Sequence, residues 1–246
     1  AKAYAENAVE RLQVTERHTF FMKYYLAPME GLTTYNFRTN WNRCYGGMDK
    51  YFTPFISNRH MNSRERNDVL PEHNVGMYTV PQILTNKAEE FLSLAEQLAG
   101  YGYHEVNLNL GCPSGTVVAR NRGAGFLGTP RELEDFLDEI FEKCPLEISI
   151  KTRIGMDYMD EWAPLLKIYQ KFPMKELIIH PRLQKEGYKG TPHLEAFAEA
   201  VEALQCPLCY NGDITSPESL TQILTKLPSI DTVMIGRGIL QNPGLL

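Results

Sequence analysis

One cysteine is the residue best placed to do chemistry in this chain. Cys112 follows a strand-like apolar run and lies between Gly111, which permits a sharp backbone turn, and Pro113, which fixes the exit. The stretch from Glu105 to Pro130 therefore predicts a buried strand, a tight turn, a long polar loop and a helix that begins at Pro130. Barrels and open sheets carry their reactive groups in loops of this kind, at the ends of the strands.

The residue type leaves three roles open for Cys112. A free cysteine most often serves as a small buried hydrophobe, although the neighbours here, among them Asn109 and Ser114, are polar. A thiol with an ordinary pKa of about 8.5 is mostly protonated at neutral pH, which suits a proton donor. A nucleophilic thiol would need an adjacent base, and His180 could serve as that base.

Other residues of interest, most of them polar, gather just after strand-like segments. They are Pro28, Met29 and Glu30 after the first strand, Gln82 near the end of the third, Asn109 after the fourth, Lys151 and Arg153 at the fifth, His180 and Arg182 at the sixth, Asn211, Gly212 and Asp213 after the seventh, and Gly236, Arg237 and Gly238 after the eighth. Strand ends are commonly polar, but so many groups suited to a polar, phosphorylated ligand indicate a shared site.

The elements that must position these residues alternate along the chain. Strands are predicted to start at Tyr24, Lys50, Tyr78, Glu105, Glu147, Glu176, Pro207 and Thr232. Helical patterns separate most of them, so the sequence predicts a parallel sheet closed into a (β/α)8 TIM barrel. An open doubly wound sheet is the alternative, but no GxGxxG motif follows the first strand to support it.

Helices are predicted over 34–44, 86–101, 129–143, 161–172, 193–203 and 216–227. Asn86 with Glu89 resembles a capping box, and Thr129 with Glu132 marks a second helix start. Residues 57–75 are polar without clear periodicity, so we expect a long excursion over the surface.

Two neighbouring features predict binding of an anionic cofactor. Barrels commonly build a phosphate site from the loops after strands seven and eight, where Gly212 and Gly236 allow close backbone approach and Arg237 offers a donor fork. The alternative is two glycine turns with a surface arginine. Lys151 and His180, at adjacent strand ends, could hydrogen-bond a ring carbonyl or an anionic nitrogen of a cofactor.

Composition bounds the remaining possibilities. The chain has 246 residues, 43% of them hydrophobic, enough for one barrel domain over 22–246 preceded by an N-terminal extension over 1–21. The net charge of -5 argues against binding nucleic acid through the global field, and five scattered cysteines favour the cytoplasm. No apolar run reaches the roughly 18 residues of a membrane span. We expect a monomer. We also expect no metal site, because Cys206 and Cys209 lie along a strand and lack a second pair.

The motifs, taken together and in order, resemble the tRNA-dihydrouridine synthase family. They are LAPMEG at 26–31, VPQI at 80–83, NLNLGCPS at 107–114, RGAGFL at 122–127, IKTRIG at 150–155, IHPR at 179–182, YNGDI at 210–214 and MIGRG at 234–238. The resemblance implies a barrel that binds FMN and reduces the C5–C6 double bond of uridine in tRNA, with NADPH as the reductant.

The resemblance also assigns roles residue by residue. It implies that Pro28, Met29 and Glu30 line the flavin, that Gln82, Lys151 and His180 hydrogen-bond its ring, and that Asn211, Gly212, Asp213, Gly236 and Arg237 hold its phosphate. Asn109, Arg153 and Arg182 would contact the substrate, and Cys112 would donate a proton to C5 while hydride reaches C6. Local RNA phosphate contacts would come from Arg120, Arg122, Arg153, Lys185 and Lys189.

Two positions depart from the family pattern. Gly115 stands where family members often carry a basic or bulkier residue, and the chain ends at Leu246, where they usually continue into a C-terminal helical domain. We therefore expect a barrel that lacks this domain. Three alternatives stay open: an FMN barrel acting on a small molecule, of the dihydroorotate dehydrogenase kind; a tRNA-binding module without catalysis; and a phosphosugar barrel without flavin.

Overall fold

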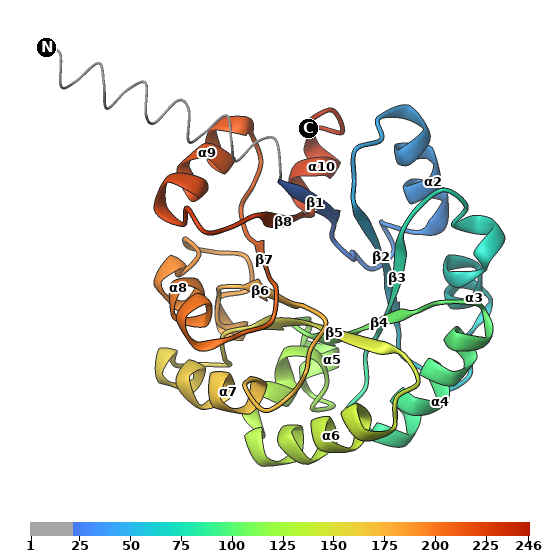
Figure 1. Ribbon diagram of the computed structural model, residues 1–246, viewed down its shortest axis with the longest axis horizontal. Coiled ribbons are helices and arrows are strands. Elements are labelled where there is room, and N and C mark those ends of the chain that lie inside the picture. Colours follow the sequence, from blue (N-terminus) through green and yellow to red (C-terminus); the bar gives the residue numbers. More distant parts are fainter. Residues whose placement is uncertain (1–21) are drawn as a thin grey trace, which may run out of the picture.

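A computed structural model describes residues 22–246, and the predicted extension over 1–21 lies outside the described residues. Eight parallel strands close into a barrel in chain order, with β8 paired to β1, so the predicted (β/α)8 fold is confirmed (Figure 1). The strands are β1 (Lys23–Leu26), β2 (Lys50–Ile56), β3 (Thr79–Ile83), β4 (Glu105–Leu110), β5 (Glu147–Arg153), β6 (Leu177–His180), β7 (Leu208–Asn211) and β8 (Thr232–Ile235). Each begins within one residue of its predicted start.

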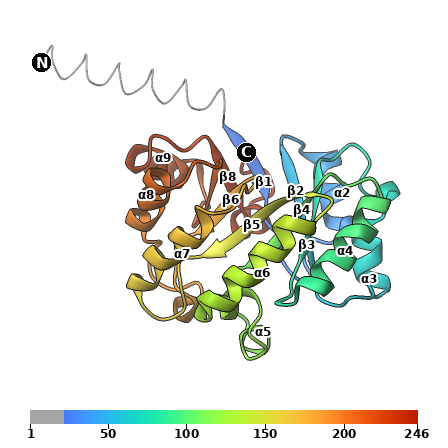
Figure 2. The same cartoon turned by 60° about the horizontal axis from the view of Figure 1, so that its bottom comes forward.

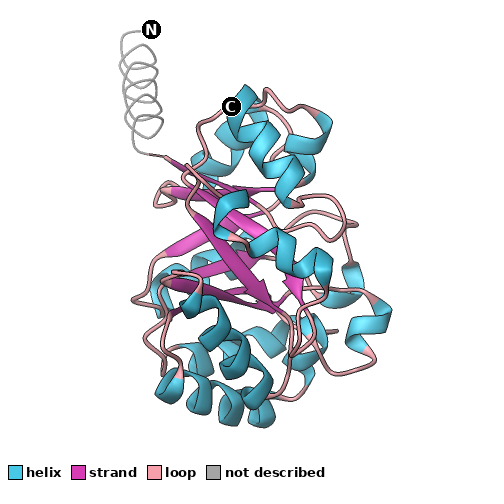
Figure 3. Ribbon diagram, turned by 90° about the vertical axis from the view of Figure 1, so that its right-hand side faces the viewer, coloured by secondary structure: helices cyan, strands magenta, loops and turns pink. Residues whose placement is uncertain are grey.

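Helices surround the strands as an outer layer, which Figure 3 shows from the side. The helices are α2 (Tyr35–Cys44), α3 (Ser63–Val69), α4 (Ala88–Gly100), α5 (Gly115–Val118), α6 (Pro130–Lys143), α7 (Trp162–Tyr169), α8 (Leu194–Ala203), α9 (Pro217–Lys226) and α10 (Arg237–Gln241). Short 3-10 turns add η1 (Pro71–His73), η2 (Gly123–Gly128), η3 (Met159–Glu161) and η4 (Gln184–Glu186). In Figure 2, α5 projects beyond the end of α6, on the loop that follows β4.

The core has two parts because side chains of a strand alternate between its two faces. Outward-facing residues such as Val106 and Leu108 of β4 pack against the helices in the larger cluster. Inward-facing residues such as Phe52, Ile178 and Cys209 fill the barrel interior. Cys209 is therefore a buried packing residue, whereas Cys206 is half-buried, and both are free thiols.

The segment 57–75 is not the irregular excursion that its composition suggested. It contains α3, whose N-terminus is capped by Asn62 in a reciprocal capping box with Glu65. The helix also buries Asp68, which lies 3.6 Å from the guanidinium of Arg38, itself fully buried. Helical hydrogen bonds and this ion pair order a segment that lacks an apolar stripe.

Two predicted helix caps are wrong in detail, although the helices exist. Asn86 does not cap α4, because its side chain donates to the carbonyl of Arg120 at 3.3 Å while Glu89 pairs with Arg59. Thr129 precedes α6 without a side-chain cap bond and instead accepts from Asn121 at 3.0 Å. Long-range partners thus replace the local capping bonds.

Candidate active site

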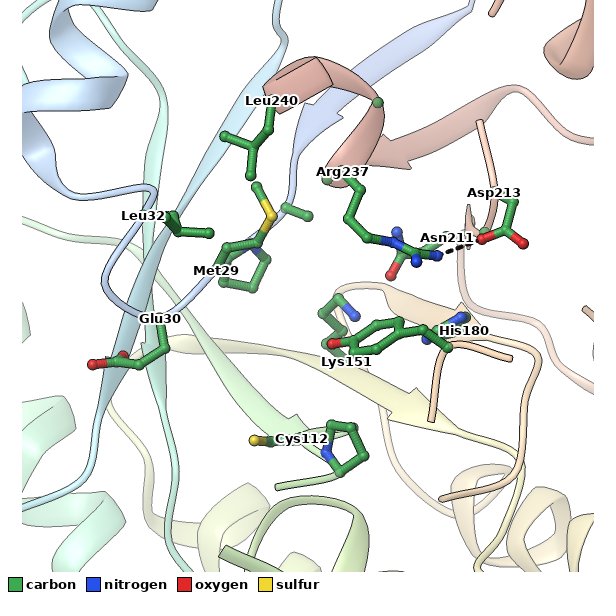
Figure 4. A pocket seen from close by; sticks show the side chains of 18 of the residues that line it. Met29, Glu30, Leu32, Cys112, Lys151, His180, Asn211, Asp213, Arg237 and Leu240 are labelled. Carbon is green, nitrogen blue, oxygen red and sulfur yellow. Dashed lines mark hydrogen bonds and ion pairs between the residues drawn. The ribbon is translucent and has the colours of Figure 1, made fainter. Parts of the chain in front are cut away.

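A cavity of about 380 Å³ opens where the strands end, at the carboxyl mouth of the barrel. All predicted site residues except Gln82 and Arg182 line it: Pro28, Met29, Glu30, Asn109, Cys112, Lys151, Arg153, His180, Asn211, Gly212, Asp213, Gly236 and Arg237. Figure 4 shows Lys151, His180, Asn211 and Arg237 gathered on one side of this space, with Cys112 separated from them. Barrel closure brings together residues that are far apart in the sequence.

The turn that carries Cys112 is held from both sides. The carboxamide oxygen of Asn109 accepts the backbone N–H groups of Gly111 at 3.0 Å and of Cys112 at 2.9 Å. On the other side, the N–H of Ala124 donates to the carbonyl of Cys112 at 3.1 Å. Gly123 has a φ of +56°, and a Cβ there would lie 2.9 Å from the same carbonyl oxygen. Residues 122–125 (RGAG) therefore support the backbone of Cys112, and only glycine fits at position 123.

The thiol of Cys112 is half-buried and kept in its protonated form. Burial raises its pKa, and this effect outweighs the opposing N–H of Ser114 and the nearby charges of Lys151 and Arg153. In Figure 4 the sulfur points away from His180. His180 has a pKa well below its ordinary value because of burial and the surrounding cations, and its Nε2 lies 3.1 Å from Nη1 of Arg182. A neutral imidazole that accepts from an arginine is a poor base for this thiol.

The ammonium group of Lys151 lines the cavity and has no neighbouring carboxylate in the described part of the chain. It makes no hydrogen bond or ion pair with any residue of 22–246, and burial together with Arg153 lowers its pKa to about 8. Arg153 is 1% exposed and donates to the carbonyls of Gly111 and Leu183, at 2.9 and 3.0 Å, rather than to a carboxylate. Buried cations without counter-charges are costly, so this wall is suited to an anionic ligand.

Asp213 holds two arginines on the same side of the cavity as His180 and Asn211 (Figure 4). Its carboxylate accepts from Arg182 at 3.1 Å and from Arg237 at 2.7 Å. Burial raises its pKa, but these arginines outweigh that effect and leave the pKa below the ordinary value. A carboxylate would repel a phosphate, so any phosphate contact from this loop falls to Arg237 and the backbone. Arg182 lies fully buried behind Asp213 and supports it.

The glycines of this region are required by close packing. A Cβ on Gly212 would lie 2.1 Å from the hydroxyl of Tyr210, and one on Gly238 would lie 2.1 Å from the carbonyl oxygen of Ile214. At Gly236 the nearest atoms, in Ala27 and Met29, would be 3.3 Å away. Larger residues at Gly212 and Gly238 would therefore displace the loops that line this part of the cavity.

Gln82 does not reach the cavity. Its side chain is fully buried behind Asn109, where its Oε1 accepts from Asn109 and its Nε2 donates to Asn107, both at 2.8 Å.

The cations expected to contact RNA differ from one another in exposure. Arg122 is largely buried and pairs with Glu90 at 3.1 Å, whereas Arg120, Lys185 and Lys189 are exposed on the loops after β4 and β6.

Tyr188 is the most prominent lining residue that the sequence analysis missed. Its ring stacks on His180 with centroids 6.0 Å apart, and the guanidinium groups of Arg153 and Arg237 lie 5.4 and 4.7 Å from its centroid. An aromatic residue among the basic residues of the loop after β6 was the available signal. Phe55 at the end of β2, a strand to which no site residue was assigned, also lines the cavity.

The fold and site together define a parallel (β/α)8 barrel with a cation-rich cavity at its carboxyl mouth. The family model for dihydrouridine synthase matches residues 25–246. This chain belongs to the dihydrouridine synthase family.

Individual relatives agree with that assignment. A probable tRNA-dihydrouridine synthase of Staphylococcus epidermidis is 34% identical over 170 residues, which cover 67% of this chain and 51% of the relative. A tRNA-dihydrouridine synthase B of Pasteurella multocida is 27% identical over 223 residues, covering 90% of this chain and 67% of the relative. The chain thus spans about half the length of the staphylococcal relatives that it matches.

Solved structures support the fold alone. Morphinone reductase superposes with a TM-score of 0.61 at 12% identity, covering 91% of this chain and 84% of the other. A histamine dehydrogenase from Rhizobium gives a TM-score of 0.64 at 11% identity, covering 91% of this chain and 45% of the other.

Residues 22–246 hold neither a candidate membrane-spanning helix nor a candidate metal cluster. No helix of this part of the chain is both long and apolar enough to cross a membrane. Within the same residues, no group of three or more His, Cys, Asp or Glu side chains is arranged to hold a metal ion.

Proposed function

We propose that this barrel binds FMN and reduces uridine in tRNA to 5,6-dihydrouridine, with NADPH as the reductant. The observation that carries the proposal is the protonated thiol of Cys112, which faces the same cavity as the unpaired ammonium of Lys151. Reduction of a conjugated double bond needs an acid near one carbon and a hydride donor near the other. Family membership supports uridine as the substrate, and tRNA is also what the names of the relatives specify.

The residues present fit a phosphorylated flavin. Lys151 is a half-buried cation without a counter-charge among residues 22–246, and a flavin ring offers it carbonyl oxygens and an anionic nitrogen. Arg237 and the tightly packed turns at Gly212 and Gly236 would take the phosphate. Pro28 and Met29 supply apolar surface for a planar ring system. When bound and reduced, the flavin supplies a hydride.

The protein's own residues then bind the uracil and move one proton. Asn109 and Arg153 lie beside Cys112 in the wall and would orient the base. The thiol of Cys112 holds the proton that C5 receives, and burial keeps that proton on sulfur at neutral pH. His180 stays neutral under the influence of burial and its cationic neighbours, so it serves as a hydrogen-bonding group rather than a charged one.

A uridine within folded tRNA must leave its stack to enter a barrel mouth. The exposed cations Arg120, Lys185 and Lys189 would then contact neighbouring phosphates, which lets an acidic chain bind RNA locally. A monomeric state and a cytoplasmic location are parts of the same proposal.

The test compares Cys112→Ala with Cys144→Ala, a half-buried cysteine that does not line the cavity. Cys112→Ala is expected to keep the visible flavin spectrum and its bleaching by NADPH. It should lose dihydrouridine formation on unmodified tRNA by about a hundredfold or more, as befits loss of a positioned acid. Cys144→Ala should match the unaltered protein in both measurements.

Each outcome separates one part of the proposal. Full tRNA reduction by Cys112→Ala would remove the proton-donor role. A protein that stays colourless after addition of FMN would remove the cofactor. A flavin-loaded protein that reduces free pyrimidines or small enones but not tRNA would favour the small-molecule alternative.

A further inference from the structure

A row of buried polar side chains lies behind the Cys112 turn and crosses three strands. Gln82 of β3, Asn107 of β4 and Ser149 of β5 are paired in register, and all three are fully buried. None of them lines the cavity. Inward-facing positions at this depth could be filled by apolar residues, as they are in the interior cluster of Phe52, Val80 and Ile178, so this polar row calls for an explanation.

The row is a continuous chain of hydrogen bonds that ends at the catalytic turn. Asn109 Nδ2 donates to Gln82 Oε1 at 2.8 Å, and Gln82 Nε2 donates to Asn107 Oδ1 at 2.8 Å. Asn107 Nδ2 then donates to Ser149 Oγ at 3.0 Å. At the other end, Asn109 Oδ1 accepts the N–H groups of Gly111 and Cys112.

The direction of every bond in this row follows from the backbone. Two N–H groups require an oxygen at the outer end of Asn109, so its nitrogen must face Gln82. Gln82 must then present its oxygen to Asn109 and its nitrogen to Asn107. Asn107 must in turn present its oxygen to Gln82 and its nitrogen to Ser149, whose hydroxyl accepts. Each amide of the row therefore has one allowed orientation, and Ser149 supplies the last acceptor.

We propose that Asn107 and Ser149 are positioning residues for the reaction at Cys112. Neither residue lines the cavity, but through Gln82 they hold the Asn109 carboxamide that supports the Cys112 backbone. The proposal rests on the proposed function for its activity readout. It also predicts a property of the thiol that can be measured without any activity.

Removing the hydroxyl of Ser149 leaves Asn107 Nδ2 without an acceptor in a fully buried place. If Asn107 turns over to relieve this, two donors meet at Gln82. If Gln82 follows, two donors meet at Asn109, which can turn only by giving up its bonds to the N–H groups of Gly111 and Cys112. The defect therefore ends at the cysteine turn rather than staying local.

The test uses Ser149→Ala and Asn107→Leu as breaking variants and Asn107→Asp as the conservative one. In either protonation state, a carboxyl group at 107 can accept from Gln82. If it is charged, the hydroxyl of Ser149 donates to its second oxygen, and if it is neutral, its own hydroxyl donates to Ser149. Ile150→Val is the matched control, since Ile150 is the fully buried neighbour of Ser149 on the opposite face of β5.

Two quantities are measured on the flavin-loaded protein. One is the rate of alkylation of Cys112 by iodoacetamide as a function of pH, read by peptide mass mapping so that the other four cysteines do not interfere. The other is single-turnover reduction of tRNA. Both breaking variants should retain the flavin spectrum, shift the alkylation profile of Cys112, and lose about tenfold to a hundredfold in turnover, the scale of a small misplacement of a reacting group. Asn107→Asp should stay within a few fold of the unaltered protein in both.

Turnover in the breaking variants equal to that of Ile150→Val overturns the proposal. If Asn107→Leu does not fold, Ser149→Ala decides alone. If the unaltered protein fails to reduce tRNA, the proposed function fails. The alkylation profile of Cys112 then decides whether Asn107 and Ser149 position the thiol. A shift in Ser149→Ala but not in Ile150→Val supports positioning of the thiol, and identical profiles overturn it.

Discussion

The two ends of this barrel hold buried charges in opposite ways. At the amino-terminal end, the ammonium of Lys50 lies 3.0 Å from Glu105 and 3.3 Å from Glu176. The hydroxyl of Tyr25 donates to Glu176 at 2.8 Å, and that of Tyr78 donates to Glu105 at 3.1 Å. Every charge in this group has a partner within the protein.

At the carboxyl mouth, β5 carries two cations that have no counter-charge among residues 22–246. Lys151 has no hydrogen-bond partner among residues 22–246, and Arg153 donates to two carbonyl groups and lies over the ring of Tyr188 rather than pairing with a carboxylate. The amino-terminal group is thus complete in itself and is expected to contribute to stability, whereas the proposed ligand would complete the mouth. Barrels commonly divide stability and catalysis between their two faces in this way.

Replacing Lys50 with methionine should give the largest effect on stability. Two neighbouring carboxylates would lose their shared cation in a buried place, which costs about 3–5 kcal/mol of unfolding free energy. Denaturant unfolding measures this loss, with flavin affinity as a second readout that should change little. Part of the stability should return as the pH falls, because burial and the charge of Glu105 already raise the pKa of Glu176, and protonation of Glu176 relieves the repulsion. A loss below about 1 kcal/mol would mean that this group is not the stabilising one.

The strands and most of the site could be predicted because they depend on simple patterns. Buried parallel strands such as Leu177–His180 are short apolar runs, and barrel topology then places the residue after each run at the mouth. This is why Cys112, Lys151 and Arg237 were expected to share a cavity, as they do. Composition alone does not predict helix α3, because the segment is polar and lacks an apolar stripe, although Asn62 and Glu65 form a capping box that marks its start.

Other features depend on contacts that no local pattern contains. Asn86 was expected to cap α4, but its amide is used by the carbonyl of Arg120, far away in sequence. Gln82 lies behind Asn109 rather than in the cavity wall, and the irregular register between β2 and β3 that sets its depth cannot be counted from spacing alone. Asp213 was grouped with the phosphate-binding residues, and only the folded structure shows the two arginines that it bridges.

The matching substitution at the mouth, Lys151→Met, should affect stability in a different direction. Removal of a half-buried cation that lacks a partner is expected to leave the unfolding free energy of the flavin-free protein unchanged or to raise it by about 1 kcal/mol. Affinity for FMN should fall about tenfold to a hundredfold, because a hydrogen bond from a charged donor contributes about 1.5–3 kcal/mol. Fluorescence titration with FMN and denaturant unfolding, on the same preparation, give both numbers. A clear loss of stability without loss of FMN affinity would mean that Lys151, like Lys50, stabilises the fold rather than binding the ligand.

The smallest and most specific effect is on the pH dependence of FMN binding. In the free protein the pKa of Lys151 is lowered to about 8 by burial and by Arg153, so its charge is lost as the pH rises through that value. An anionic ligand favours the charged form, and binding above this pH must therefore take up a proton. The affinity should decline by at most about tenfold for each pH unit above the pKa, and should level off below it. Lys151→Met should bind more weakly but without this decline, whereas Cys112→Ala should retain it, because the pKa of that thiol is raised rather than lowered. A decline that persists in Lys151→Met would assign the titration to another group and remove Lys151 as the charge that the ligand neutralises.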